Sequence, residues 1–200
     1  YKSVPPDVYS GPRCRHAGAR LQSAGVSLQC MSMTLGRSRR YPNGRWGRDG
    51  FDLEGAVRDV SELLRTVPDS LFVIGLNLGP YAEFAEDHPD EVWISKFGTR
   101  VYGSSNHNSG CVKPDEPIPA PYHAKISMSS LVWRNEVKDL LSRLIGALRA
   151  KGLSKRIVGV HLSGFHDGQF ATSPWPDFSK PALAAYRRKI GDPNAGLPPI

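Results

Sequence analysis

The chain has 200 residues, of which 40% are hydrophobic and 22% are charged, a composition typical of an ordinary globular domain. No apolar stretch approaches the roughly 18 residues needed to span a bilayer, so we expect no membrane partner. The formal net charge is +7 at pH 7, and much of the excess lies in one segment rich in turn formers. That segment predicts a solvated basic loop, and we expect no nucleic-acid partner. Its arginines are Arg37, Arg39, Arg40, Arg45 and Arg48.

The three cysteines, Cys14, Cys30 and Cys111, are odd in number and widely spaced. Neither a disulfide framework nor a metal site has this spacing, so we expect free thiols and no metal. The sequence implies no cofactor. The sequence starts at Tyr1 without a charged-then-apolar leader, which leaves the cellular compartment open.

The first element predicted along the chain is a half-buried strand over residues 25–35, where Val26, Leu28 and Cys30 alternate with polar residues. A surface loop rich in Gly, Pro and Asn follows it. We therefore interpret residues 1–50 as an N-terminal strand with a basic loop.

A helix is predicted next, because apolar residues recur at steps of three and four from Leu53 to Val67. Asp52 and Glu54 place negative charge at its beginning, where it suits the helix dipole, and Pro68 ends it. The apolar run over residues 71–78 then predicts a central parallel strand that is buried on both faces.

The long polar connection over residues 79–126 is unusual in a compact domain. Its apolar anchors are Tyr81, Phe84 and Trp93. They favour an ordered loop that covers a site, although Phe84 and Trp93 could equally pack the loop onto the body of the domain.

A long helix is predicted to begin at Ser129 or Ser130 and to end at Gly152. A second buried strand follows over residues 156–162, and a third helix is expected from about Ser179, with Pro181 in its first turn.

Alternation of strands and helices predicts an α/β fold with a parallel sheet. Long polar loops after the strands and the lack of a Gly-rich phosphate turn favour a (β/α)8 barrel over a doubly wound sheet. Only about three strand-helix units are visible, so we expect a partial barrel as a single domain over residues 1–200, with the βα units in 51–200. Open barrel edges would expose apolar surface, and we expect self-association through them.

Candidate site residues follow the two apolar strands. Asn77 lies near the end of the first, and a buried amide needs hydrogen-bond partners, of which a ligand hydroxyl is one. His161, His166, Asp167 and Gln169 lie at and after the end of the second, where barrel enzymes place catalytic groups. A polar turn and an ordinary core histidine are the structural alternatives.

The segments 157–170 and 176–190 resemble the middle of family 42 glycoside hydrolases, the β-galactosidase-like barrels. The run His-Pro-Asp-Glu at residues 88–91 and the segment 130–134 are similar too, and the resemblance covers roughly residues 50–200. The second segment matches a family pattern at Asp177, Phe178, Ser179, Ala182, Tyr186 and Arg187.

This resemblance implies hydrolysis of O-glycosidic bonds with a carbohydrate as substrate or ligand, using two carboxyl groups. Gln169 stands where the family has its acid/base glutamate, and an amide cannot supply that proton. Asp167 is the nearest substitute, and no segment corresponds to the nucleophile strand. The resemblance further implies that Asn77, Tyr81, Trp93, His161 and His166 line the sugar site.

Three alternatives remain at this stage. The first is a carbohydrate-binding pseudoenzyme that has lost its acid/base group at Gln169. The second is a metal-dependent hydrolase with His161, His166 and Asp167 as ligands. The third is nucleic-acid binding by the loop at residues 37–48, where Arg, Tyr and Trp interleave.

Overall fold

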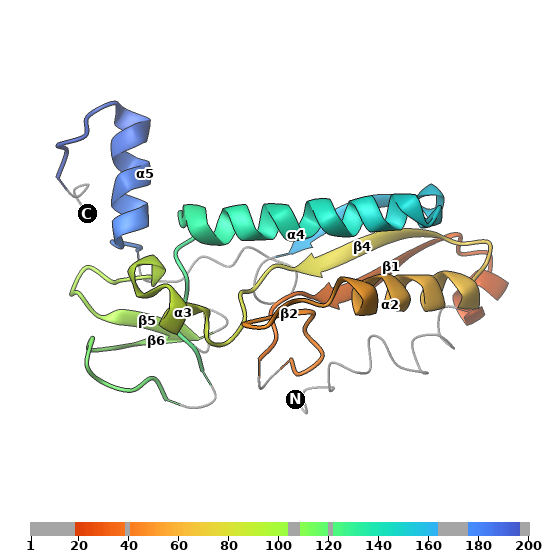
Figure 1. Ribbon diagram of the computed structural model, residues 1–200, viewed down its shortest axis with the longest axis horizontal. Coiled ribbons are helices and arrows are strands. Elements are labelled where there is room, and N and C mark those ends of the chain that lie inside the picture. Colours follow the sequence, from red (N-terminus) through yellow and green to blue (C-terminus); the bar gives the residue numbers. More distant parts are fainter. Residues whose placement is uncertain (1–18, 39–40, 104–108, 120–121, 164–175, 197–200) are drawn as a thin grey trace. The chain divides into compact units, whose positions relative to one another are not determined.

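The computed structural model describes residues 19–38, 41–103, 109–119, 122–163 and 176–196 (Figure 1). The chain divides into two compact units, which are described separately. The first unit comprises residues 1–81 and 139–169, and the second comprises residues 82–138 and 170–200. The elements of the first unit are β1 (Leu28–Thr34), β2 (Trp46–Gly47), β3 (Gly50–Phe51), α2 (Leu53–Thr66), β4 (Leu71–Asn77), η3 (Leu153–Arg156) and β7 (Ile157–Ser163).

The second unit holds the elements that lie between β4 and the long helix, together with the last helix. Helix α4 contributes residues to both units. These elements are α3 (Phe84–Asp87), η2 (Pro89–Glu91), β5 (Arg100–Gly103), β6 (Ser109–Val112), α4 (Leu131–Ala150) and α5 (Lys180–Ile190).

A parallel three-stranded sheet forms the centre of the first unit, in the order β1-β4-β7. Thr34 pairs with Asn77, and Asn77 pairs with Ser163, so the carboxyl ends of all three strands lie at one edge. The predicted α/β alternation and the parallel pairing of the two apolar strands are therefore confirmed. Three strands do not close into a barrel within the described residues.

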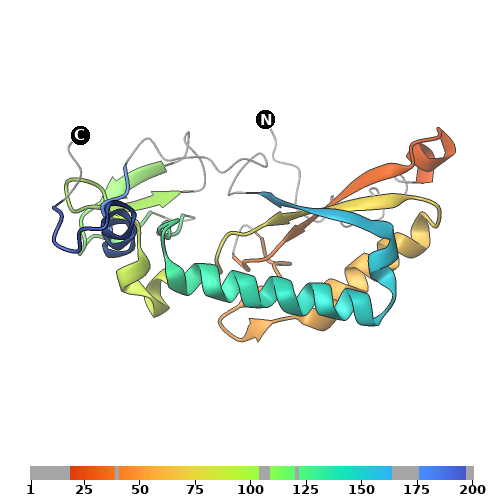
Figure 2. The ribbon, with the colours of Figure 1, turned by 90° about the horizontal axis from the view of Figure 1, so that it is seen from above.

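Helices α2 and α4 cover the same face of the sheet. Figure 2 shows α2 and the first-unit part of α4 on one side of β1, β4 and β7. We call this the helical face. It buries Met33, Phe72, Ile74 and Leu76, each at most 6% exposed.

We call the opposite side the open face, because neither α2 nor α4 covers it. Leu28 and Leu71 are 54% and 41% exposed there. Strand pairing and alternation assign ten residues to it. They are Leu28, Cys30, Ser32, Thr34, Leu71, Val73, Gly75, Asn77, Gly159 and His161.

Two burial predictions are wrong. Leu28 and Cys30 were expected on the buried side of β1, but Met33 and Leu35 are buried instead. Strand β7 was expected to be buried, yet Val158 and Leu162 are 55% and 41% exposed because β7 lies at an edge of the sheet. Likewise, β4 is central as predicted. Its helical face and Gly75 are buried, whereas Leu71 is exposed and Val73 and Asn77 are half-buried on the open face.

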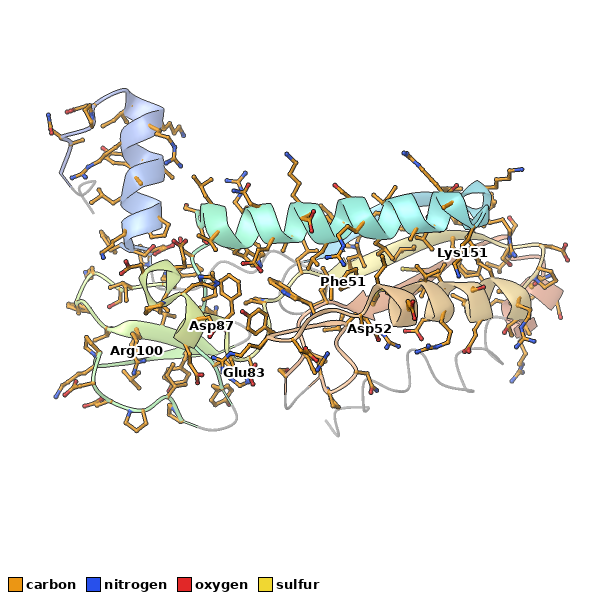
Figure 3. All side chains as sticks on the ribbon, viewed as in Figure 1. Phe51, Asp52, Glu83, Asp87, Arg100 and Lys151 are labelled. Atoms are coloured by element: carbon orange, nitrogen blue, oxygen red, sulfur yellow. The ribbon has the colours of Figure 1, made fainter. Side chains whose placement is uncertain are left out.

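Helix α2 forms as its apolar stripe predicts, with Ala56, Val57, Val60 and Leu64 buried. Asp52 is its N-cap and accepts a hydrogen bond from the Gly55 N–H at 2.8 Å (Figure 3). This bond, assisted by the Arg45 guanidinium, lowers the pKa of Asp52. The cap therefore favours the ionised carboxylate at neutral pH.

The long helix α4 also begins and ends at the predicted residues. The Ser130 hydroxyl accepts a hydrogen bond from the Trp133 N–H at 3.0 Å, which satisfies a free donor of the first turn. Gly152 follows the helix with a φ of 69°, a left-handed conformation that glycine adopts without strain.

The second unit contains sheet structure that the sequence did not predict. Strands β5 and β6 form an antiparallel hairpin. Three backbone hydrogen bonds extend it. The Trp93 backbone N–H donates to the Lys125 carbonyl at 2.8 Å, and the Lys125 backbone N–H donates to the Val101 carbonyl at 2.8 Å. The Val101 backbone N–H donates to the Trp93 carbonyl at 3.0 Å. The long connection is thus ordered where it is described, as its aromatic anchors predict.

Candidate functional site

The carboxyl edge of the parallel sheet gathers the polar residues of the open face. Asn77 is the last residue of β4, and His161 lies on β7 in register with Gly75, two residues before it. Adjacent strands are about 4.8 Å apart, so the two side chains are diagonal neighbours on one face. The structure therefore brings together two of the residues that the sequence singled out.

Asn77 is half-buried, and one end of its amide is occupied. Its Oδ1 accepts a hydrogen bond from the Gly79 N–H at 3.1 Å, which shapes the turn leaving β4. The amide nitrogen has no partner among the described residues. Asn77 can therefore offer two N–H donors to a ligand at this edge.

His161 is exposed on the open face and has no side-chain partner among the described residues. It is not the buried, satisfied core histidine that was the structural alternative. An exposed imidazole beside an amide can donate or accept hydrogen bonds, and its ring offers an apolar surface to a ligand.

Thr34 and Ser32 on β1 belong to the same edge, and sequence reasoning did not single them out. Thr34 pairs with Asn77, and Ser32 pairs with Gly75. Both follow Leu28 and Cys30 at steps of two residues, on the side of the strand that the alternation predicted to be buried, so their hydroxyls gave no signal of a site. We call Ser32, Thr34, Asn77 and His161 the polar rim.

Tyr81 packs within the first unit, where it is 7% exposed. Its ring lies edge-on to Trp46, with ring centroids 5.2 Å apart and an interplanar angle of 80°. The contact between these two rings therefore helps to hold the basic loop against the end of β4.

Trp93 lies in the second unit and is 7% exposed. The Nζ atom of Lys125 is 5.5 Å from the centre of its ring, and burial lowers the pKa of Lys125. The Trp93 Nε1 atom is buried without a hydrogen-bond partner among the described residues. These contacts agree with the packing interpretation of Trp93.

The remaining sequence candidates, His166, Asp167 and Gln169, lie outside the described residues. Two of the three ligands in the metal-site hypothesis, His166 and Asp167, therefore lie outside the described residues, and only His161 is described. Within the described part of the chain, no group of three or more His, Cys, Asp or Glu residues could hold a metal ion.

The basic loop is held by carboxylates of its own unit. Arg45 forms ion pairs with Asp52 at 2.8 Å and with Asp59 at 2.5 Å, and Arg37 pairs with Asp49 at 3.1 Å. Such pairing reduces the positive charge available to a phosphate.

Of the described helices, none is long and apolar enough to cross a membrane.

The segment that carries part of the family resemblance has a local structural role. Asp177 accepts a hydrogen bond from the Ser127 hydroxyl at 2.6 Å and another from the Ser179 N–H at 2.9 Å. Ser179 in turn is the N-cap of α5. These residues connect residues 126–127 with the beginning of α5.

One hollow of the first unit lies on the helical face. It has a volume of about 350 Å³ and is lined by apolar residues that include Ile74, Leu144 and Val160. It lies on the side of the sheet opposite to Asn77, so it is distinct from the polar rim.

No model of a known protein family matches the chain, and no curated protein matches it.

Proposed function

We propose that the chain is part of a glycosidase-type (β/α) barrel that binds carbohydrate at the carboxyl ends of β1, β4 and β7. The observation that carries the proposal is the polar rim, a set of neutral hydrogen-bonding side chains at the carboxyl edge of a parallel sheet. Barrel enzymes bind their substrates at this edge of the sheet.

The winding of the first unit fits a barrel, as it also fits one βαβαβ half of a doubly wound sheet. Strands that follow one another in the same order along the chain and across the sheet, each joined by a right-handed crossover, place every helix on one face. A doubly wound sheet reverses its order and carries helices on both faces. The order β1-β4-β7 has no reversal, and α2 and α4 cover one face (Figure 2).

The open face also has the polarity of a barrel interior. Leu28, Leu71 and Val73 lie toward the amino ends of the strands, and the polar rim lies toward the carboxyl ends. In a closed barrel the apolar part would face other strands and the polar part would line the mouth of the site. The same polarity supports self-association of the chain through its open face and edges, since large exposed apolar surfaces mark interaction sites.

Carbohydrate is the ligand class that the resemblance implies, and the chemistry of the polar rim is consistent with it. Hydroxyl groups of a sugar both donate and accept hydrogen bonds, as do hydroxyl, amide and imidazole side chains. Gln169 at the acid/base position argues that this chain binds sugar without efficient hydrolysis. A glycoside hydrolase with Asp167 as the acid is the second form of the proposal.

Isothermal titration calorimetry with methyl β-galactoside tests the binding site. We expect saturable binding to the full chain and a loss of about tenfold in affinity for Asn77→Ala, the loss of roughly one hydrogen bond. Asn135→Ala, on the exposed side of α4, is the matched control and should bind like the wild type. Equal affinity of Asn77→Ala and the wild type would contradict the proposed site.

Release of nitrophenol from nitrophenyl β-galactoside distinguishes the two forms of the proposal. The pseudoenzyme predicts no release by the wild type, whereas Gln169→Glu supplies a carboxylic acid at the expected position and should raise the rate. Turnover by the wild type that is lost in Asp167→Asn would instead identify a hydrolase that uses Asp167.

A further inference from the structure

Strand β1 brings two hydroxyl groups to the same edge as Asn77. Thr34 lies directly beside Asn77 in the parallel pairing, and Ser32 lies beside Gly75. Paired residues of parallel strands point to the same face of the sheet. The backbone pairing therefore places both hydroxyl side chains on the open face.

The surroundings of Gly75 confirm this placement from side-chain positions. A Cβ atom added to Gly75 would lie 3.6 Å from the Ser32 Oγ atom and 3.6 Å from the Cys30 Sγ atom. Ser32 and Cys30 thus project on the side of the sheet to which a side chain at residue 75 would point. Because residue 75 is glycine, it adds no side chain between Ser32 and His161, and Gly75 itself is buried there.

Apart from the Asn77 Oδ1 atom, the side-chain hydrogen-bonding groups of the polar rim have no partner within the described part of the chain. The hydroxyls of Ser32 and Thr34 contact no donor or acceptor there. Asn77 uses only its Oδ1, toward the Gly79 N–H at 3.1 Å. Ser32 and His161 are exposed, and Thr34 and Asn77 are half-buried.

The open face carries no Asp, Glu, Lys or Arg among its ten described residues. The arginines of the adjoining loop whose contacts are described are paired: Arg37 with Asp49, and Arg45 with Asp52 and Asp59. A charged ligand at the rim would therefore lose hydration without gaining an ion pair from these groups. A neutral ligand has no such cost.

We infer that Ser32 and Thr34 are ligand-binding residues of the polar rim and that the ligand is a neutral, hydroxyl-rich molecule. This inference rests on the proposed function and extends it to β1 and to the charge of the ligand. Neighbouring strands are about 4.8 Å apart, and residues two positions apart along a strand are separated by about 6.6 Å. Groups at these spacings can contact different hydroxyls of a single sugar ring.

Calorimetry with two probes tests the inference. Thr34→Val keeps the shape and β-propensity of the side chain and removes only the hydroxyl, and Ser32→Ala does the same for Ser32. Each should weaken methyl β-galactoside binding by about tenfold. Thr66→Val on α2, whose hydroxyl bonds the Glu62 carbonyl at 2.9 Å, is the control and should bind like the wild type. The charged probe, galacturonate, should bind at least tenfold more weakly than the neutral sugar.

The results of these titrations can overturn this inference without overturning the proposed function. Normal binding by Thr34→Val and Ser32→Ala, with loss in Asn77→Ala, would overturn the role of β1 and leave the proposed function in place. Galacturonate binding as tightly as the neutral sugar would overturn the expected neutrality. Absence of binding by the wild type would overturn both.

A second variant, Gly75→Ala, tests the same inference if the Thr34→Val protein does not fold. Gly75→Ala adds one methyl group at ordinary contact distance from its neighbours, so the sheet can accommodate it. The added methyl narrows the space between Ser32 and His161 and should weaken sugar binding. Unchanged affinity for a folded Gly75→Ala protein would contradict the inferred position of the ligand.

Discussion

The guanidinium of Arg156 holds the carbonyl oxygen of Ser70 with two nitrogen atoms, at 2.9 Å from Nε and 2.7 Å from Nη2. The same group donates to the Leu64 carbonyl at 2.7 Å and to the Val67 carbonyl. Arg156, immediately before β7, thereby satisfies the last carbonyls of α2 and fixes the beginning of β4. It is one reason why β4 and β7 reach the same edge in register.

Replacing Arg156 by Met should lower the free energy of unfolding by about 2–3 kcal/mol, because buried carbonyls lose a charged donor. Lysine should restore little of this, since one ammonium cannot reproduce the fork of the guanidinium. Urea denaturation measures the effect. Arg149→Met, at an exposed position of α4, is the control and should change stability by less than about 0.5 kcal/mol. Equal stability of the two variants would contradict this role of Arg156.

Substitutions of two glycines test the close approach of Gly36 to Pro80 at the end of β1. A Cβ atom on Gly36 would lie 2.2 Å from the Pro80 carbonyl oxygen, so Gly36→Ala should destabilise the fold by about 3 kcal/mol. Gly146 lies inside α4 with nothing within 4 Å, so Gly146→Ala should stabilise by up to about 1 kcal/mol. Thermal melts of both variants measure these opposite shifts, and a tolerated Gly36→Ala would show that the close approach is wrong.

The contact between Ser127 and Asp177 predicts a local effect on α5. Asp177→Ala removes acceptors of the Ser127 hydroxyl and the Ser179 N–H, at a cost of about 1–2 kcal/mol. Amide hydrogen exchange should then speed up at the beginning of α5, while exchange in β4 stays as in the wild type. Asp192→Ala, after the helix, serves as the control. Unchanged protection of the first turn of α5 would argue against the contact.

The buried Lys125 predicts a particular dependence of stability on pH. Burial lowers its pKa from the usual 10.5, so between the lowered pKa and 10.5 the unfolded chain binds more protons than the folded one. The free energy of unfolding should therefore rise with pH across that interval. Below the lowered pKa the unfavourable contribution of the charged group is present in full.

Denaturation of the wild type and of Lys125→Met between pH 7 and 10.5 measures this dependence. The wild type should gain stability relative to Lys125→Met as the pH rises. Lys151→Met, at an exposed position (Figure 3), should follow the wild type. Parallel curves for all three proteins would show that Lys125 is not buried as described.

The order of the elements could be predicted from local signals, because periodicity and capping residues are local properties. Ser130 and Ser179 begin their helices where the sequence placed them, and Gly152 follows the end of α4 as expected. These are residues whose side chains or conformations act on backbone groups only a few positions away.

Features that depend on distant partners could not be predicted in the same way. Both sides of β1 carry apolar residues, so its sequence alone did not decide whether Leu28 or Met33 is buried. The partner of Tyr81 is Trp46, far away in sequence. The position of Thr34 beside Asn77 becomes visible only from the strand pairing. The strands of the β5-β6 hairpin are short and partly polar, and they give too weak an alternation to be recognised.

The proposed function requires that a neutral sugar binds at the carboxyl edge of the parallel sheet. The most direct test is a titration of ¹⁵N-labelled protein with methyl β-galactoside, followed by NMR. We predict saturable shifts of the backbone amides of Thr34, Asn77, Gly79 and His161, with little change in the α2 amides. Shifts confined to other parts of the chain, or none at millimolar sugar, would contradict the account.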